Sequence, residues 1–309
     1  MNQIPVIQNG EKQVERLAAQ RELYSSAKNY YSAESVGSVI IPVLLTTVSI
    51  FITNISLYSA LYGICFYLFD SLIIEPLIID RKTKAAKIQE LFDCEVLEIE
   101  KSPFKAVSDV TVEEVLTHYD AHSKVETNIE NIKDWYPKEV GELDISIARL
   151  ICQRMNYGWD TKLRKSFSHL LKIIAVFIAI MIIVGITVGR LPGQDLPLIL
   201  SGILPLFRFC MKLYQDNKSS TEKLTKLNNY FDGLWERIKK DEVSEIKLGE
   251  AARRIQDEIY DNRTKNPLIP DVFYKFFRSK DESVMAKSAK SFVGEYNQLK
   301  NGENKGFAD

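Results

Sequence analysis

Polar and apolar residues are distributed unevenly along the chain, and two long stretches carry no charged side chain. Residues 36–69 contain no Lys, Arg, Asp or Glu, and residues 173–189 form a second charge-free run. A helix needs about 20 apolar residues to cross a hydrocarbon core of about 30 Å. The first run, with its apolar continuation to Ile79, is about twice that length and therefore predicts more than one crossing.

Short polar breaks divide each apolar region into two predicted helices. TNIS at 53–56 interrupts the first region, and GRLPGQDLP at 189–197 interrupts the second with Gly, Pro and Asp, which favour turns. The alternative is a soluble protein with long buried core helices, which rarely needs two charge-free runs of this length. We predict two hairpins, with spans at 36–53, 56–79, 168–188 and 197–213.

Basic residues gather on one side of these predicted hairpins. Lys and Arg precede the first and third spans and follow the second and fourth, whereas the two outer turns together contain one basic residue, Arg190. Because positively charged flanks remain on the cytoplasmic side, we expect both termini and the middle segment in the cytoplasm. The N-terminus lacks the basic-then-apolar order of a signal peptide, so the first span is expected to direct insertion itself.

The predicted fold class is a mainly α integral membrane protein with four transmembrane helices in two hairpins. Its cytoplasmic domain is expected to be mostly helical, with one short strand pair, because CEVLEIE at 94–100 alternates apolar and polar residues. The predicted segments are an N-terminal cytoplasmic helix at 1–34, hairpins at 35–80 and 167–213, a middle domain at 81–166, C-terminal helices at 214–300 and a flexible tail at 301–309.

Helical periodicity is clear in the polar regions. Residues 9–34 form an amphipathic pattern, Thr111 is placed to cap a helix, and residues 141–167 are predicted to run as helix into the third span, with Gly158 as a candidate break. A further set recurs at steps of three and four, which suits a coiled-coil-like seam within the chain or between copies. Its members are Leu224, Leu227, Phe231, Leu234 and Ile238.

Small and polar residues form narrow stripes on three of the four predicted spans. Such stripes allow close helix packing, and they also suit the lining of an aqueous path, so both interpretations stay open. The candidate pore or gating residues are Ser38, Thr46 and Ser49 on the first span, Ser59 and Asp70 on the second, and Ser201 and Arg208 on the fourth.

Asp70 is the most informative of these residues, because a carboxylate within hydrocarbon is costly and commonly functional. It lies about 21 Å along the helix from the outer turn, in the inner third of the membrane. Arg208 is expected at comparable depth. A pair of these two could hold a closed state or be a static ion pair, and in an oligomer a ring of Asp70 side chains would attract cations.

Catalytic and metal-binding signals are missing from the sequence. It contains no P-loop, GxSxG, HExxH or strand-to-helix GxGxxG motif. His118 and His122 share a helical face, but no third ligand accompanies them, and the four cysteines show no CxxC or Cys/His spacing. We therefore predict no enzyme activity, no metal and no disulfide framework.

The middle segment contains residues suited to a nucleotide, because aromatic faces stack on bases and Arg side chains bind phosphates. The same aromatic residues are also typical of a protein core or a membrane interface. The candidate ligand-binding residues are Trp135, Tyr136, Arg149, Arg154, Trp159 and Arg164.

Several stretches carry a family resemblance. QNGEKQVERLAAQRELYSSAK, QELFDCEVLEI, DWYP followed by ICQRMNYGWDTKLRKSF, and NPLIPDVFYKFFR occur in this order over nearly the whole chain. Together they resemble the SMODS-associated four-transmembrane effector family. The motifs are distinctive but carry no catalytic meaning.

The resemblance implies a bacterial inner-membrane effector of anti-phage (CBASS-type) defence. Such an effector senses a cyclic nucleotide made by a cognate nucleotidyltransferase and permeabilises the membrane, which kills or arrests the cell. The implied partners are lipids, further copies of the chain and the cyclic oligonucleotide as activating ligand, with no DNA or RNA polymer and no cofactor. The alternative hypothesis is a membrane-anchored interaction scaffold, which predicts no ion flux with any ligand.

Overall fold

The structure is a computed structural model that describes residues 1–49, 55–104, 110–188 and 196–306 of the chain. Within these ranges every regular element is a helix; η1 and η2 are π-helical and η3 is a 3-10 helix. The elements are α1 (Ile4–Ile7), α2 (Glu11–Ser35), η1 (Val36–Ile40), α3 (Ile41–Ser49), α4 (Ile55–Phe69), η2 (Asp70–Ile74), α5 (Glu75–Val96), α6 (Val112–Ser123), α7 (Glu126–Glu130), η3 (Lys138–Glu142), α8 (Ile145–Val188), α9 (Leu196–Lys239), α10 (Glu245–Lys265) and α11 (Asp271–Gly306).

The prediction of a mainly α fold is confirmed, and the predicted strand pair at 94–100 is wrong. Residues 94–96 form the last turn of α5, and the chain then leaves the helix through Glu98, whose φ is 50°. Val96 and Leu97 are both fully buried, and Ile99 is nearly so. The alternation in the sequence therefore reflects a helix end turning into the core, with no neighbouring strand among the described residues.

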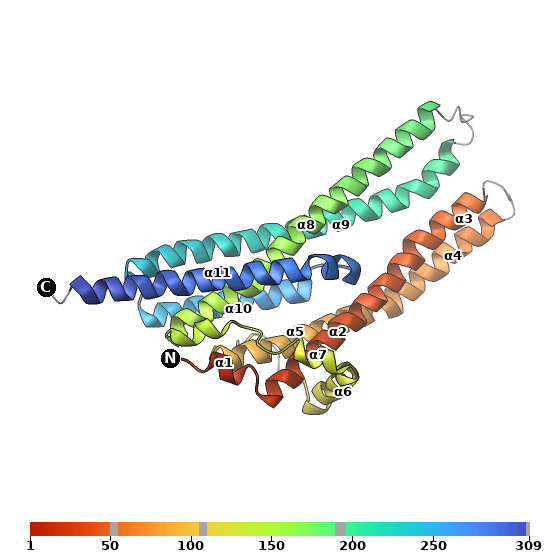
Figure 1. The fold of residues 1–309 in the computed structure, drawn as a ribbon. Coiled ribbons are helices and arrows are strands. Elements are labelled where there is room, and N and C mark those ends of the chain that lie inside the picture. The colour runs from red at the N-terminus through yellow and green to blue at the C-terminus, as the bar shows by residue number, and fades with distance from the viewer. Residues whose placement is uncertain (50–54, 105–109, 189–195, 307–309) are drawn as a thin grey trace.

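Two long helical arms project from one end of a helical body (Figure 1). The first arm consists of η1, α3, α4 and η2, and the second consists of the adjoining parts of α8 and α9. Each arm is reached by helices that continue from the body without a break, since η1 follows α2 directly and α5 follows η2 directly. The predicted divisions after residues 80, 166 and 213 all fall inside continuous helices.

The arms expose apolar side chains that a water-soluble surface would bury. Ile64, Tyr67 and Leu72 of the first arm are 61%, 68% and 73% exposed, and Ile173 and Phe177 of the second are 65% and 60% exposed. Among the described residues, one helix, Leu61–Val96, is long and apolar enough to cross a membrane, and 11% of its apolar stretch is buried. The number of spans stays a prediction.

The first arm contains two π-helical segments, η1 and η2, which are uncommon and often mark functional positions. In η1 the ring of Phe66 lies against Gly37 so closely that a Cβ atom on Gly37 would overlap it. The Tyr62 hydroxyl donates a hydrogen bond of 2.8 Å to the carbonyl oxygen of Gly37, and Tyr62 stacks on Phe66. The base of the first arm is therefore tightly packed around a position that only glycine fits.

We expect Gly37→Ala to destabilise the chain by about 1–3 kcal/mol, because inserting a methyl group into a packed contact forces the ring aside. The measurement is the thermal unfolding midpoint of the detergent-solubilised protein. Gly63→Ala is the matched control on the same arm, because nothing lies within 4 Å of a Cβ atom there. Equal midpoints for the two variants would contradict the packing argument.

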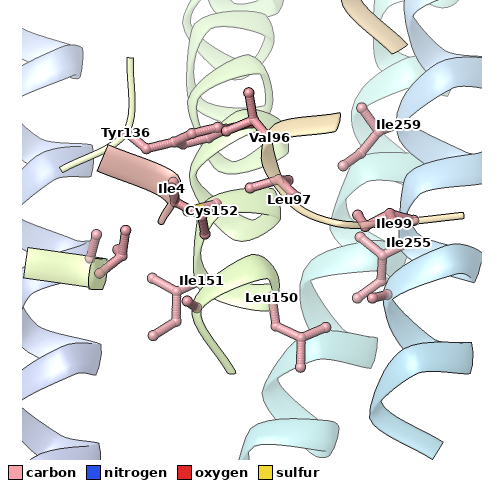
Figure 2. Close-up of a cluster of buried hydrophobic side chains, with 14 of the residues drawn as sticks. Ile4, Val96, Leu97, Ile99, Tyr136, Leu150, Ile151, Cys152, Ile255 and Ile259 are labelled. Carbon is pink, nitrogen blue, oxygen red and sulfur yellow. The ribbon is translucent and has the colours of Figure 1, made fainter. Parts of the chain in front are cut away.

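The body buries the main hydrophobic core, which joins α1, α2, α5, η3, α8, α9, α10 and α11 and is drawn in part in Figure 2. Leu224, Leu227, Phe231 and Leu234 of the predicted seam are buried in this core. The seam is therefore used for packing within the chain. The amphipathic helix at 9–34 is confirmed as α2, whose apolar face is buried, and the Thr111 hydroxyl accepts a hydrogen bond of 3.2 Å from the Glu114 amide at the start of α6.

Helix α8 runs through Gly158 without the break that the sequence suggested. The guanidinium group of Arg154 occupies the space where a side chain at this position would begin. Glycine is therefore used here so that Arg154 can pack against the helix. As a result, α8 is a continuous helix of 44 residues.

Candidate functional site

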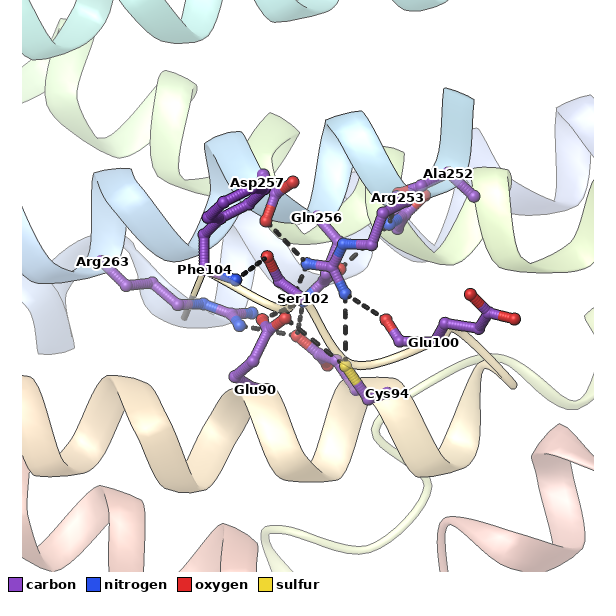
Figure 3. Close-up of polar contacts among 12 residues, drawn as sticks. Glu90, Cys94, Glu100, Ser102, Phe104, Ala252, Arg253, Gln256, Asp257 and Arg263 are labelled. Atoms are coloured by element: carbon purple, nitrogen blue, oxygen red, sulfur yellow. Dashed lines mark hydrogen bonds and ion pairs between the residues drawn. The ribbon is translucent and has the colours of Figure 1, made fainter. Parts of the chain in front are cut away.

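Helix α10 connects the helices that continue into the two arms, because it packs against α5 and also against α8 and α9. A group of polar side chains fills these contacts, drawn in part in Figure 3. We call it the α10 network; its members are Glu90, Asp93, Tyr136, Gln153, Arg253, Gln256 and Arg263. The residues come from α5, α8, α10 and the loop before η3.

Asp93 is the centre of the network and is fully buried. Its Oδ2 atom accepts hydrogen bonds from Arg263 Nη1 at 2.6 Å and from Gln256 Nε2 at 3.0 Å. Its Oδ1 atom accepts one from the Tyr136 hydroxyl at 2.8 Å. A buried carboxylate is tolerated when a cation and several donors satisfy it, and Asp93 has both.

Glu90 lies one turn earlier on α5 and repeats this arrangement. Its carboxylate accepts hydrogen bonds from Arg253 Nη2 at 2.8 Å and from Gln256 Nε2 at 2.7 Å. Gln153 of α8 extends the chain of contacts by donating to the Oε1 atom of Gln256 at 2.9 Å. One amide side chain, Gln256, thus connects both carboxylates of α5 to α8.

The protonation states in the network favour a fixed structure. Burial lowers the pKa of the Arg263 guanidinium, but the charge and hydrogen bond of Asp93, together with Tyr24 and Tyr136, raise it, so the net shift is upward. Burial and Asp93 raise the pKa of the Tyr136 hydroxyl, which therefore remains a donor. Burial raises the pKa of the Cys94 thiol to about 12, so this cysteine is neutral and a poor nucleophile.

A second polar cluster lies where the arms leave the body. Arg164 of α8 donates from Nε to Asp160 at 2.9 Å, and from Nη1 to Asn217 Oδ1 and to the Pro267 carbonyl at 3.1 Å each. Asn217 of α9 donates back to the Arg164 carbonyl at 2.8 Å. These bonds fix α8, α9 and the segment that follows α10 to one another.

Of the predicted ligand-binding residues, Tyr136 belongs to the α10 network and Trp135 is its neighbour in the chain. Tyr136 is fully buried and stacks on Phe92, so its side chain is a core residue. Trp135 is partly buried and donates from Nε1 to Asn156 at 3.3 Å, while the Arg21 guanidinium lies 5.6 Å from the centre of its ring.

The other four predicted ligand-binding residues are not brought to one place. Arg149, Arg154, Trp159 and Arg164 follow one another on α8 at steps of five, which rotates each by about 140° from the last. Arg149 donates to the Glu98 carbonyl, and Arg154 lies over the rings of Tyr157 and Phe231. Trp159 packs against a small apolar cluster that contains Leu163, Phe167, Leu171 and Ile269. Their role in ligand binding stays a prediction.

The candidate pore residues are only partly described. Ser38, Ser59 and Asp70 are partly buried, Arg208 is exposed, and the side chains of Thr46, Ser49 and Ser201 lie outside the described residues. No ion pair joins Asp70 to Arg208, and no described residue hydrogen-bonds to the buried Oδ1 atom of Asp70. A gating role for these residues stays a prediction.

Sequence reasoning missed the centre of the network. Glu90 and Asp93 are separated by three positions in a buried part of α5, and this pairing of acids on a buried helix face is the one local signal that could have found them. Arg263, the partner of Asp93, is 170 positions further along the chain. Among the described residues no group of three or more His, Cys, Asp or Glu side chains could hold a metal ion.

Comparison with known proteins places the chain in a family. Residues 2–292 match the SMODS-associating 4TM effector domain. The chain belongs to the SMODS-associating 4TM effector family. A curated protein from Bacillus cereus (strain VD146), described as a probable CBASS effector molecule, is 27% identical over 286 residues, covering 90% of this chain and 94% of that protein. No solved structure matches the chain.

Membership of the 4TM effector family agrees with the exposed apolar arms and with the long apolar helix Leu61–Val96. Both observations support a membrane protein. The match covers the arms and most of the body, so the α10 network lies within the family domain.

Proposed function

We propose that this 4TM effector acts in bacterial anti-phage defence by permeabilising the inner membrane when a cyclic nucleotide binds its cytoplasmic body. Family membership and the curated CBASS relative support the defence role. One structural observation carries the mechanism: the helices that form the arms continue into the body, where α10 fastens them together.

In this mechanism the arms span the membrane as two hairpins, with both termini in the cytoplasm. Ligand binding gates the arms only if the ligand has a higher affinity for the permeable state than for the closed state. The α10 network is suited to such coupling, because it connects α5, which continues from the first arm, to α8, which continues into the second. Several copies are needed to enclose a pore, since four helices leave little room among themselves.

The test is leakage of dye and ions from vesicles that contain the purified full chain, with a panel of cyclic mono-, di- and trinucleotides. We expect one ligand to trigger release, and Asp70→Asn or Arg208→Ala to weaken release in protein that still inserts. Both side chains belong to the arms rather than the body, so ligand binding by these variants should remain unchanged.

Two outcomes would contradict the proposal. Leakage that does not depend on any ligand would indicate a constitutive pore and remove the sensing role. Absence of leakage with every ligand would favour the membrane-anchored scaffold, in which the arms only tether the body.

A further inference from the structure

Two cationic side chains converge on the residues that directly follow α10, on the side of the body from which the arms leave (Figure 1). Lys82 of α5 donates from Nζ to the Asn266 carbonyl at 3.2 Å, and Arg164 of α8 donates from Nη1 to the Pro267 carbonyl at 3.1 Å. These carbonyls belong to consecutive residues, so the positive charges of α5 and α8 are held close together.

The positive charge at this position is only partly neutralised. Arg164 is paired with Asp160, whereas no carboxylate of the described residues lies within ion-pair distance of Lys82. Burial lowers the pKa of Lys82, and the positive charge of Arg164 lowers it further. Two cations that disfavour each other in a partly buried place would be stabilised by an anion between them.

Hydrogen-bond donors are also left over at this end of α10. An ammonium group has three donors, and the structure uses one of those of Lys82. The side-chain amide nitrogens of Asn262 and Asn266 have no acceptor among the described residues, although the two residues are only 6% and 5% exposed. Asn262 belongs to the last turn of α10, and Asn266 directly follows the helix, with its backbone amide donating to the Asn262 carbonyl at 2.9 Å.

We propose that this end of α10 is an anion site that binds one phosphodiester group. Lys82 and Arg164 supply the positive charge, and the amides of Asn262 and Asn266 supply neutral hydrogen bonds. Arg and Lys are the usual partners of phosphate oxygens. Buried amide donors without an acceptor are costly, and a phosphate oxygen would satisfy them.

Two sources supply a phosphodiester at this place, a cyclic oligonucleotide from the cytoplasm and the headgroup of an anionic lipid at the root of the arms. The nucleotide source rests on the proposed function, whereas the lipid source does not. In either case the anion would bind between α5 and α8, the helices that continue into the two arms.

The experiment measures binding by the full chain in two separate assays. In the first, cyclic di- and trinucleotides are titrated against detergent-solubilised protein by equilibrium dialysis. In the second, the thermal midpoint is compared in nanodiscs of phosphatidylcholine with and without phosphatidylglycerol. The main variant is Lys82→Gln, which loses one hydrogen bond within the protein and is therefore expected to fold.

We expect Lys82→Gln to weaken nucleotide binding about ten- to a hundredfold, as for loss of a charged hydrogen bond, or to abolish the stabilisation by phosphatidylglycerol. Lys84→Gln is the matched control, because Lys84 is already paired with Asp80 at 3.3 Å and with Glu114 at 2.8 Å. Arg164→Lys, which keeps the charge but loses the planar fork, is expected to weaken binding less than Lys82→Gln.

The assay in which Lys82→Gln has an effect identifies the source of the phosphodiester. Equal losses in Lys82→Gln and Lys84→Gln would overturn the site, because they would indicate only general charge attraction. The site would also be overturned if the unchanged protein showed neither nucleotide binding nor stabilisation by phosphatidylglycerol. Failure of the proposed function is distinct: the protein would then bind a nucleotide through Lys82, yet vesicles would not leak.

Discussion

Replacing Asp93 with Asn is expected to destabilise the chain by about 3–5 kcal/mol, the effect typical of breaking a buried ion pair from one side. The substitution keeps the size of the side chain, but it leaves the Arg263 guanidinium without the carboxylate that lies 2.6 Å from it. Asp93 is fully buried, so water cannot replace the lost charge. The measurement is the thermal unfolding midpoint of the detergent-solubilised protein.

A control and a double variant separate this charge effect from a general effect of substitution on α5. Glu95→Gln removes an exposed carboxylate that pairs with Lys12 and Arg16 on the protein surface, and surface pairs contribute about 0–1 kcal/mol. Asp93→Asn combined with Arg263→Gln should be less destabilised than the sum of the single variants. A strictly additive double variant would show that the pair does not act as a unit.

Replacing Phe231 with Ala is expected to cost about 3–5 kcal/mol, because truncating a buried aromatic residue leaves a cavity. Phe231 is fully buried on α9. Its ring stacks on Trp235 at 5.8 Å, contacts the edge of Phe292 on α11 at 5.4 Å, and lies 5.7 Å from the Arg154 guanidinium of α8. Thermal unfolding of the solubilised protein measures the loss.

The neighbouring residue provides the matched control. Tyr230 occupies the same helix turn but is 43% exposed, so Tyr230→Ala should change the free energy of unfolding by about 0.5 kcal/mol or less. Phe231→Leu should lie between the two, since it fills part of the cavity. A similar loss in Tyr230→Ala and Phe231→Ala would mean that α9 responds to helix propensity rather than to packing.

Features with a local cause could be predicted from the sequence. The amphipathic pattern of 9–34 and the cap at Thr111 each depend on neighbours within a few positions, and both are present in the structure. The alternation at 94–100 is equally local, yet it was misleading. A strand requires a partner, and a seven-residue pattern does not report whether the chain supplies one.

The candidate site could not be predicted in the same way, because its contacts are distant in the sequence. Asp93 and Arg263 meet only when α10 packs against α5, and Lys82 and Arg164 approach each other through carbonyl groups at the end of α10. The sequence pointed to Tyr136 for its chemistry, but the fold uses its hydroxyl to satisfy Asp93. Residue type indicates what a side chain can bind, and only packing decides its partner.

The unbroken course of α8 gives the molecule a mechanical property. At 44 residues the helix is ~66 Å long, and α9 beside it has the same length. Rotation of such a rigid pair by about 5° at the body end would displace the far end by about 6 Å, roughly one helical turn. Through such a rotation the paired helices would convert a small adjustment beside α10 into a large displacement at the far end of the arm.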